Sequence, residues 1–98
     1  MYNVQYSTAA VKYIKKIRNR ELKGEIKKAI DILAENPYCG EAKMGDLQGL
    51  FGYDVFYDGI NYEIAYTIND NSIMITVIMV GTRENFYKEL KRYLKSAR

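Results

Sequence analysis

The sequence contains no histidine and no tryptophan, and it has a single cysteine and a single proline in 98 residues. Cys39 alone cannot form an intrachain disulfide, and without histidine the chain offers no cluster of the kind that binds zinc. The absence of histidine also removes the most common general base of enzymes. Any catalysis must therefore depend on carboxylates, tyrosine, lysine or arginine, and we expect neither a metal ion nor a cofactor.

Long apolar runs are also missing. No stretch approaches the roughly 20 residues that span a bilayer, and polar residues interrupt every apolar run within residues 1–20, so no signal-peptide core is visible there. We therefore expect a cytoplasmic protein that does not associate with membranes. With 48% hydrophobic and 28% charged residues, the composition is typical of a globular protein, and we expect residues 1–98 to form a single domain.

The third absence is local, because no lysine or arginine lies between Lys43 and Arg83. The segment between them contains five acidic residues. The flanking segments are the reverse, with nine bases against five acids before residue 44 and six bases against two acids after residue 82. Because the positions of its charges set the electric field of a small domain, this division is informative about partners.

The N-terminal part has signals for one strand and two helices. Residues 2–6 alternate between apolar and polar side chains, which predicts a short strand with one buried face. Ser7 and Thr8 are candidates for the N-cap of the helix that follows. A second apolar stripe, with helical spacing, predicts a helix over residues 20–35.

Asn19 is the expected break between the two helices, and Pro37 ends the second, because the residue before a proline disfavours the helical conformation. Residues 38–49 contain three glycines and are expected to form a loop.

Alternating patterns then predict three strands, over residues 51–57, 61–68 and 73–80. Asp58-Gly59 is a strong signal for a tight turn between the first two strands, and residues 69–71 form the next turn. The third strand is apolar on both sides, which is typical of a strand covered on both faces.

A last helix is predicted from about Glu84. Its apolar face consists of Phe86, Leu90, Tyr93, Leu94 and Ala97, and basic residues occupy much of the rest. The order is therefore β-α-α-β-β-β-α. We expect an α+β fold in which a helical hairpin packs on a mostly antiparallel four-stranded sheet, with the helices on one face.

This pattern resembles the RelE/ParE superfamily of toxins from bacterial type II toxin–antitoxin modules. The similarity covers nearly the whole chain, with family-like fragments at residues 4–7, 46–49, 62–66 and 80–87. The resemblance implies a toxin with a cognate acidic antitoxin as its partner. On the RelE side, which the last fragment favours, it also implies ribosome-dependent endonucleolytic cleavage of mRNA without a metal.

The resemblance also implies candidate catalytic residues. Arg83 matches the basic residue that follows the last strand in the family, and Tyr87 matches a C-terminal tyrosine that contacts RNA. Glu41 has the spacing of a general-base glutamate in the YoeB-like branch. Glu63 does not follow from the resemblance, but a carboxylate near a phosphate and tyrosines can have a raised pKa and serve as the base. Alternatively, Arg83 pairs with Glu84 or caps the neighbouring helix, and Tyr87 packs at the seam between helix and sheet.

Candidate RNA-binding residues lie in the loop and on the last helix. Some relatives carry phosphate-binding lysines in the loop, where this chain has only one base, and lysine and arginine side chains that contact phosphates dominate the affinity for nucleic acids. The alternatives are that the basic side chains of the last helix bind an acidic antitoxin segment, or that these side chains are simply solvated. The candidates are Lys43, Lys91, Arg92 and Lys95.

The chain departs from the family pattern on the second and third strands. Glu63 replaces the arginine of the family's Y-R-I-x-Y strand, and Asp54 and Phe56 stand where relatives often carry bases. The alternation places all three on one side of a strand pair. A phosphate beside such carboxylates is repelled by about 1 kcal/mol per close pair in a water-like environment.

Two other functions therefore stay open. A ParE-like toxin inhibits DNA gyrase by binding it and needs no catalytic arginines, so the missing bases favour this alternative. A catalytically impaired protein with the toxin fold, which only binds its antitoxin, is the other.

Overall fold

A computed structural model describes residues 1–96 and shows that local signals fix the two N-terminal helices. Helix α1 (Thr8–Lys16) begins after Ser7, whose hydroxyl oxygen accepts a hydrogen bond from the Ala10 amide at 3.0 Å. Helix α2 (Arg20–Glu35) begins after Asn19, whose side-chain oxygen accepts from two amides of the first turn. These caps satisfy amides that would otherwise lack partners. Within the described residues, no helix is long and apolar enough to cross a membrane.

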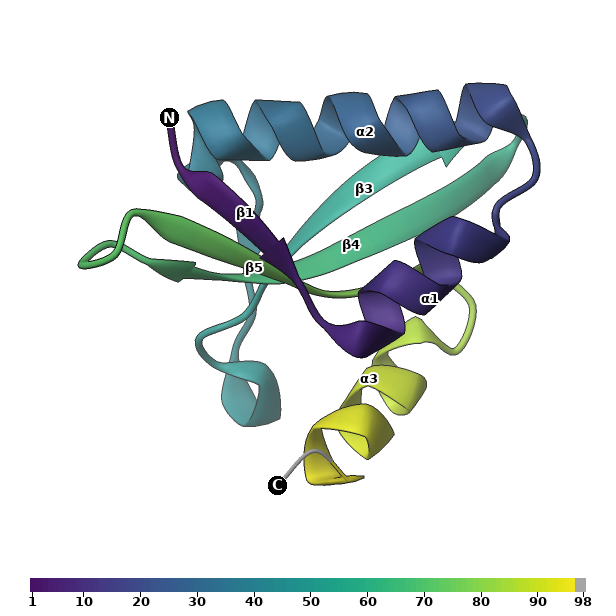
Figure 1. The fold of residues 1–98 in the computed structure, drawn as a ribbon. Helices are drawn as coiled ribbons and strands as arrows, with labels where there is room; N and C mark the ends of the chain where they lie inside the picture. Colours follow the sequence, from purple (N-terminus) through teal and green to yellow (C-terminus); the bar gives the residue numbers. More distant parts are fainter. Residues whose placement is uncertain (97–98) are drawn as a thin grey trace.

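The sheet has five strands in the order β1-β5-β4-β3-β2. Figure 1 labels four of them, β1, β5, β4 and β3. Strands β3 (Phe51–Tyr57), β4 (Ile60–Asn69) and β5 (Met74–Thr82) form an antiparallel meander. Strand β1 (Asn3–Tyr6) pairs in parallel with β5. The turn at Asp58-Gly59 is confirmed, and both residues have positive φ angles, as a tight hairpin turn requires.

The prediction of four strands is wrong by one. The fifth strand, β2 (Glu41–Ala42), pairs antiparallel with the start of β3, inside the segment predicted as a loop. It is only two residues long and both are exposed, so it has no alternation that a sequence pattern could reveal. The same segment contains the short 3-10 helices η1 (Pro37–Cys39) and η2 (Gly45–Leu47).

Helix α3 (Phe86–Ser96) begins two residues later than predicted. Asn85 has a φ of 62°, a left-handed conformation that cannot continue a helix, so the helix begins after it. Phe86 and Leu90 are buried, as the helical periodicity predicts. Ala97, which the sequence places on the same face, lies outside the described residues.

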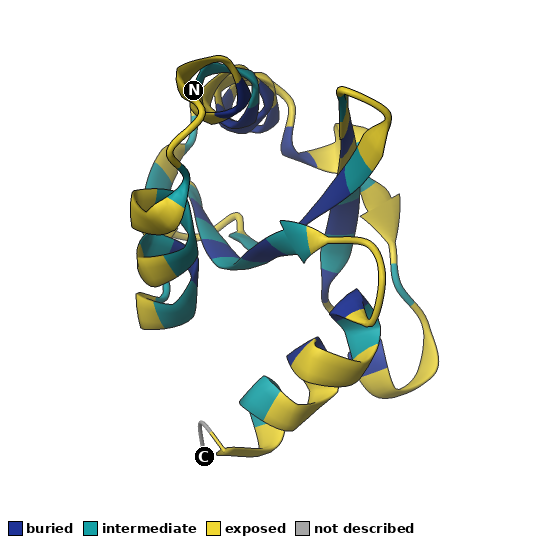
Figure 2. Cartoon of the chain, turned by 90° about the vertical axis from the view of Figure 1, so that its right-hand side faces the viewer, coloured by how far each residue is buried: buried dark blue, intermediate teal, exposed yellow. Residues whose placement is uncertain are grey.

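The helices cover both faces of the sheet, so the expectation that they share one face is wrong. Helices α1 and α2 pack on one face, against Ile64 and Tyr66 of β4. Helix α3 and the segment before β3 pack on the other face, against Ala65. Figure 2 shows the sheet between α2 above and α3 below, with buried residues turned toward it. Successive residues of β4 therefore face two different cores, and Glu63 lies on the side of α3.

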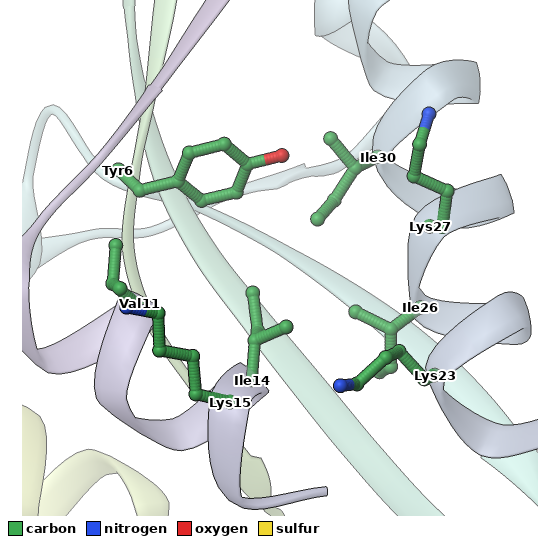
Figure 3. Close-up of a pocket in the computed structure, with 8 residues that line it drawn as sticks. All are labelled: Tyr6, Val11, Ile14, Lys15, Lys23, Ile26, Lys27 and Ile30. Atoms are coloured by element: carbon green, nitrogen blue, oxygen red, sulfur yellow. The ribbon is translucent and has the colours of Figure 1, made fainter. Parts of the chain in front are cut away.

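A groove of about 320 Å³ opens between α1 and α2 beside β1 (Figure 3). Ile14, Ile26 and Ile30 make much of its lining apolar. Lysine side chains from both helices also line it: Lys15, Lys23 and Lys27.

Candidate functional site

A buried carboxylate lies at the middle of the sheet, on the face that carries α3. Glu63 is paired across the strands with Asp54 of β3 and with Gly81 of β5, and only 2% of its surface is exposed. The alternation of β4 points its side chain away from the core of α1 and α2, because its neighbours Tyr62 and Ile64 face that core. It is the one charged residue among residues 1–96 that is buried. A charge in such a position requires partners, since burial penalises an ionised group.

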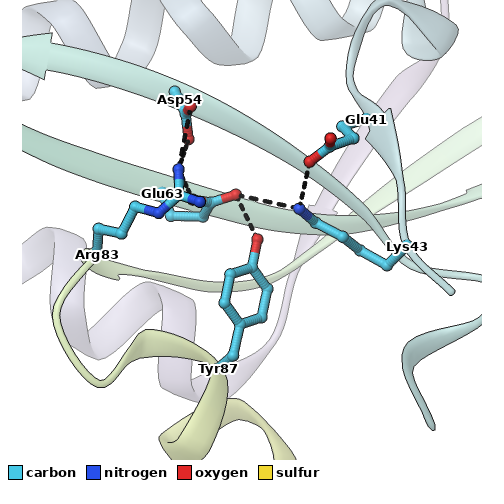
Figure 4. Close-up of polar contacts among 6 residues, drawn as sticks. All are labelled: Glu41, Lys43, Asp54, Glu63, Arg83 and Tyr87. Atoms are coloured by element: carbon cyan, nitrogen blue, oxygen red, sulfur yellow. Dashed lines mark hydrogen bonds and ion pairs between the residues drawn. The ribbon is translucent and has the colours of Figure 1, made fainter. Parts of the chain in front are cut away.

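Tyr87 and Lys43 meet this carboxylate from two other elements (Figure 4). The Tyr87 hydroxyl, from the first turn of α3, donates a hydrogen bond of 2.5 Å to Glu63 Oε2. Lys43 Nζ, from the segment after β2, lies 3.9 Å from the same oxygen and 2.7 Å from Glu41 Oε1. The ammonium also lies 4.9 Å from the centroid of the Tyr87 ring. Residues far apart in the sequence therefore converge on one carboxylate oxygen.

Arg83 covers the other carboxylate oxygen. Its Nη1 atom lies 3.7 Å from Glu63 Oε1 and 3.4 Å from Asp54 Oδ2. The side chain therefore pairs with Asp54 and Glu63 and not with Glu84, while the Arg83 carbonyl oxygen accepts a hydrogen bond from the Phe86 amide at the start of α3. Glu63 Oε1 is buried and has no hydrogen-bond partner. The Arg83 side chain is 53% exposed, so this oxygen is covered by a cation that is itself open to solvent.

The surroundings set the protonation of the cluster. Burial raises the pKa of Glu63, the hydrogen bond from Tyr87 opposes this, and the neighbouring Asp54 raises it further. Burial lowers the pKa of Lys43, but its contacts with Glu41 and Tyr87 outweigh this and raise the pKa to about 12. Burial and the hydrogen bond to Glu63 raise the pKa of Tyr87. Lys43 therefore stays a cation and Tyr87 a neutral donor, while Glu63 holds a proton more readily than an ordinary glutamate.

The two carboxylates predicted as bases differ in their environment. Glu41 is 77% exposed, and its hydrogen bond with Lys43 lowers its pKa. A lower pKa makes a carboxylate a weaker proton acceptor, whereas burial makes Glu63 a stronger one. The environment therefore makes Glu63 the stronger proton acceptor of the two.

The predicted RNA-binding residues of α3 lie outside this cluster. Lys91 pairs with Asp46 of η2 at 3.5 Å, and together with Lys95 it lines a groove of about 450 Å³. Arg92 is exposed. Tyr87 belongs to the same helix, and Lys91 and Lys95 follow it four and eight residues later, on the same helix face. Within residues 1–96, no group of cysteine and carboxylate side chains is arranged to hold a metal ion.

Sequence patterns assign no role to Gly52, which lies next to the cluster. A β-carbon at this position would lie 2.5 Å from Glu63 Oε2. The only sequence signal is that a glycine interrupts the strand pattern of residues 51–57, which is typical of a place where other atoms approach closely.

The chain belongs to the family of ParE-like toxins of type II bacterial toxin–antitoxin systems, whose family model matches residues 4–91. It is therefore a toxin of such a system, and the superfamily resemblance of the sequence is confirmed. No curated protein is significantly similar to it in sequence.

Solved structures with the same fold include RelE toxins and their complexes. The isolated RelE toxin of Escherichia coli is 21% identical with a TM-score of 0.70, and the match covers 95% of this chain and 99% of that one. The toxin–antitoxin complex RelBE2 of Mycobacterium tuberculosis gives 25% identity and a TM-score of 0.68, with 84% and 98% covered. The intact RelBE complex of Escherichia coli is 21% identical with a TM-score of 0.70, and the match covers 83% of this chain and 95% of that one.

Proposed function

We propose that this toxin is a ribosome-dependent mRNA endonuclease whose centre is the cluster around Glu63. The observation that carries the proposal is a buried carboxylate with a raised pKa, contacted by a phenol and flanked by two cations. A carboxylate tuned in this way is typical of a general base. The cations are the groups that stabilise a crowded phosphate.

The proposed reaction is attack of an RNA 2′-oxygen on the adjacent phosphorus. Glu63 accepts the 2′-hydroxyl proton, the new bond closes a 2′,3′-cyclic phosphate, and the bond from phosphorus to the 5′-oxygen breaks. The leaving 5′-oxygen takes up a proton from water. Arg83 and Lys43 stabilise the negative charge that develops on the phosphate oxygens. Tyr87 holds the Glu63 carboxylate in place through Oε2, which leaves Oε1 for the proton.

Arg83 must turn from the carboxylates to the phosphate for this reaction. Its contacts at 3.4 and 3.7 Å are long, and half of its side chain is exposed, so reorientation breaks no strong hydrogen bond. The same movement uncovers Glu63 Oε1, the buried oxygen without a partner. Binding of a phosphate and exposure of the base are therefore one event.

Lys91, Arg92 and Lys95 extend the cationic surface along α3 and are proposed to contact the RNA backbone on the ribosome. Such contacts make binding weaken as the salt concentration rises.

The charge of the cluster favours a second candidate function. Two cations, Lys43 and Arg83, face three carboxylates, those of Glu41, Asp54 and Glu63. With every carboxylate ionised the cluster is negative and repels a phosphate. A ParE-like toxin that inhibits DNA gyrase, or a toxin fold that only binds its antitoxin, does not require a cationic site here.

A cognate acidic antitoxin is the proposed partner under all of these functions. The groove between α1 and α2 supports it, because an apolar lining with lysines suits an amphipathic acidic segment. The complexes of RelE with RelB among the solved structures support a partner of this kind.

Induced expression with primer extension on mRNA tests the proposal. Growth should stop and new mRNA ends should appear, while Arg83→Ala and Tyr87→Phe should reduce cleavage by about 100-fold or more. Circular dichroism of the purified variants should show that both still fold. Arg18→Ala and Tyr53→Phe are the matched controls, because Arg18 is exposed next to α1 and Tyr53 packs on the opposite face of the sheet. Uncut mRNA during arrest excludes the nuclease, and blocked DNA supercoiling would then identify the gyrase inhibitor.

A further inference from the structure

Gly52 lies where the side chains of the cluster meet. A β-carbon on Gly52 would be 2.5 Å from Glu63 Oε2, 2.7 Å from Lys43 Cε and 3.1 Å from the Tyr87 hydroxyl oxygen. These are three of the side chains that define the proposed active site. Any side chain at position 52 would therefore enter the space that they share.

The backbone of Gly52 gives no other reason for a glycine. Gly45, Gly49 and Gly59 have positive φ angles, which favour glycine, but Gly52 does not. It lies inside strand β3, where glycine is unfavourable because it packs no side chain and gains freedom in the unfolded chain. The reason for the glycine is therefore the space above its α-carbon.

We propose that Gly52 is a positioning residue that keeps open the space in which Glu63, Lys43 and Tyr87 converge. The inference rests on the proposed function of this cluster. It extends that function to a backbone position that makes no polar side-chain contact of its own. In the reaction, Gly52 allows the carboxylate to stay under Tyr87 and beside Lys43.

The nearest atoms decide what a substitution at Gly52 would disturb. All three belong to the ends of side chains, so these ends would move before the strand does. Gly40 is different, because a β-carbon there would collide with the buried Tyr66 hydroxyl and lie 2.9 Å from a backbone oxygen. A substitution at Gly40 would therefore disturb the fold, whereas Gly52→Ala should disturb the site.

The test compares Gly52→Ala with Gly24→Ala, a matched control in α2 with no atom within 4 Å of the added carbon. Purified proteins are examined by NMR for the Tyr87 hydroxyl proton, assigned by its absence in Tyr87→Phe, and for the titration of the Glu63 carboxyl carbon. We expect Gly52→Ala to lose the hydroxyl signal and shift the Glu63 titration. Gly24→Ala should retain the hydroxyl signal and the native Glu63 titration. Primer extension should show that Gly52→Ala no longer cleaves mRNA.

The outcomes separate this inference from the proposed function. An unchanged hydroxyl signal and Glu63 titration in Gly52→Ala would overturn the positioning role. Loss of the signal with undiminished mRNA cleavage would support the positioning role and refute the cluster as the catalytic site. Loss of both the hydroxyl signal and mRNA cleavage would support the positioning role of Gly52 and the catalytic function of the cluster.

A double variant keeps the test decisive if Gly52→Ala lowers the thermal midpoint. Glu63→Asp withdraws the carboxylate by one methylene group, so the added methyl should fit better in this background. We expect a smaller decrease of the midpoint from Gly52→Ala in Glu63→Asp than in the native sequence. Equal decreases in the two backgrounds would refute crowding at Glu63.

Discussion

The buried carboxylate predicts an unusual pH dependence of stability. The pKa of Glu63 lies above its ordinary value of 4.5 in the folded protein, because burial and Asp54 disfavour the ionised form. As the pH rises above 4.5, the unfolded chain releases this proton while the folded chain retains it. The unfolded state then binds fewer protons, so the free energy of unfolding falls with rising pH until the folded group also ionises. Each unit by which the pKa is raised lowers the free energy of unfolding by about 1.4 kcal/mol once the folded group is ionised.

Glu63→Gln removes this titration and keeps the shape of the side chain. The amide oxygen can still accept from Tyr87, and the amide nitrogen can donate to Asp54, its cross-strand neighbour. Lys43 keeps Glu41 as a partner and Arg83 keeps Asp54, so neither cation is left unpaired. We therefore expect Glu63→Gln to gain stability relative to the native protein as the pH rises, by about 1.4 kcal/mol for each unit of elevated pKa.

Urea unfolding of both proteins between about pH 4 and pH 8 measures the difference. Other groups titrate in both proteins and largely cancel. Glu41→Gln is the control with the opposite sign, because the lowered pKa of Glu41 stabilises the fold above 4.5 and this stabilisation disappears as the pH falls. The quantity to follow is the free energy of unfolding of Glu63→Gln minus that of the native protein. If it stays constant or falls as the pH rises, burial does not destabilise the ionised carboxylate.

Two further substitutions test the contacts that hold the fold around the site. Asn19→Ala removes the cap of α2 and should lower the free energy of unfolding by about 1 kcal/mol, measured by urea unfolding; no loss would mean that water caps the helix equally well. Tyr66→Phe leaves the buried Pro37 carbonyl without its 2.6 Å hydrogen bond and should cost about 1 to 3 kcal/mol in thermal unfolding. A cost near zero would indicate that the carbonyl finds another donor.

The helices and the meander were predictable because their signals are local. Ser7 and Asn19 mark helix starts with side chains that bond to amides two or three residues away. The two turns of the meander likewise follow from short segments of sequence. Strand β2 has no such signal, since its pairing with Phe51 and Gly52 depends on a register that only the folded chain defines. The start of α3 was missed because the left-handed conformation of Asn85 is not visible in a helical pattern.

The membership of the candidate site was predictable in part. Arg83, Tyr87, Lys43 and Glu41 were expected from a resemblance, and the structure brings all four to Glu63 or its direct partners. Their mutual contacts were not predictable, because each comes from a different element and the distances depend on sheet register and helix docking. Asp54 was expected only to repel phosphate, but it is also the partner of Arg83.

The base-free segment of the sequence has a structural counterpart in these contacts. Lys43 and Arg83 are the bases at the two ends of this segment. Both approach Glu63, which lies near the middle of the segment. A phosphate that draws Arg83 away leaves Glu63 and Asp54 with less compensation and places another negative charge beside them, which favours the protonated form of Glu63. By linkage, protonation of Glu63 must strengthen phosphate binding by the same factor. Any RNA binding at this site should therefore strengthen as Glu63 takes up a proton, whereas the ionised carboxylate is the form that can accept the 2′-hydroxyl proton. Inhibition of gyrase would require no such pH dependence.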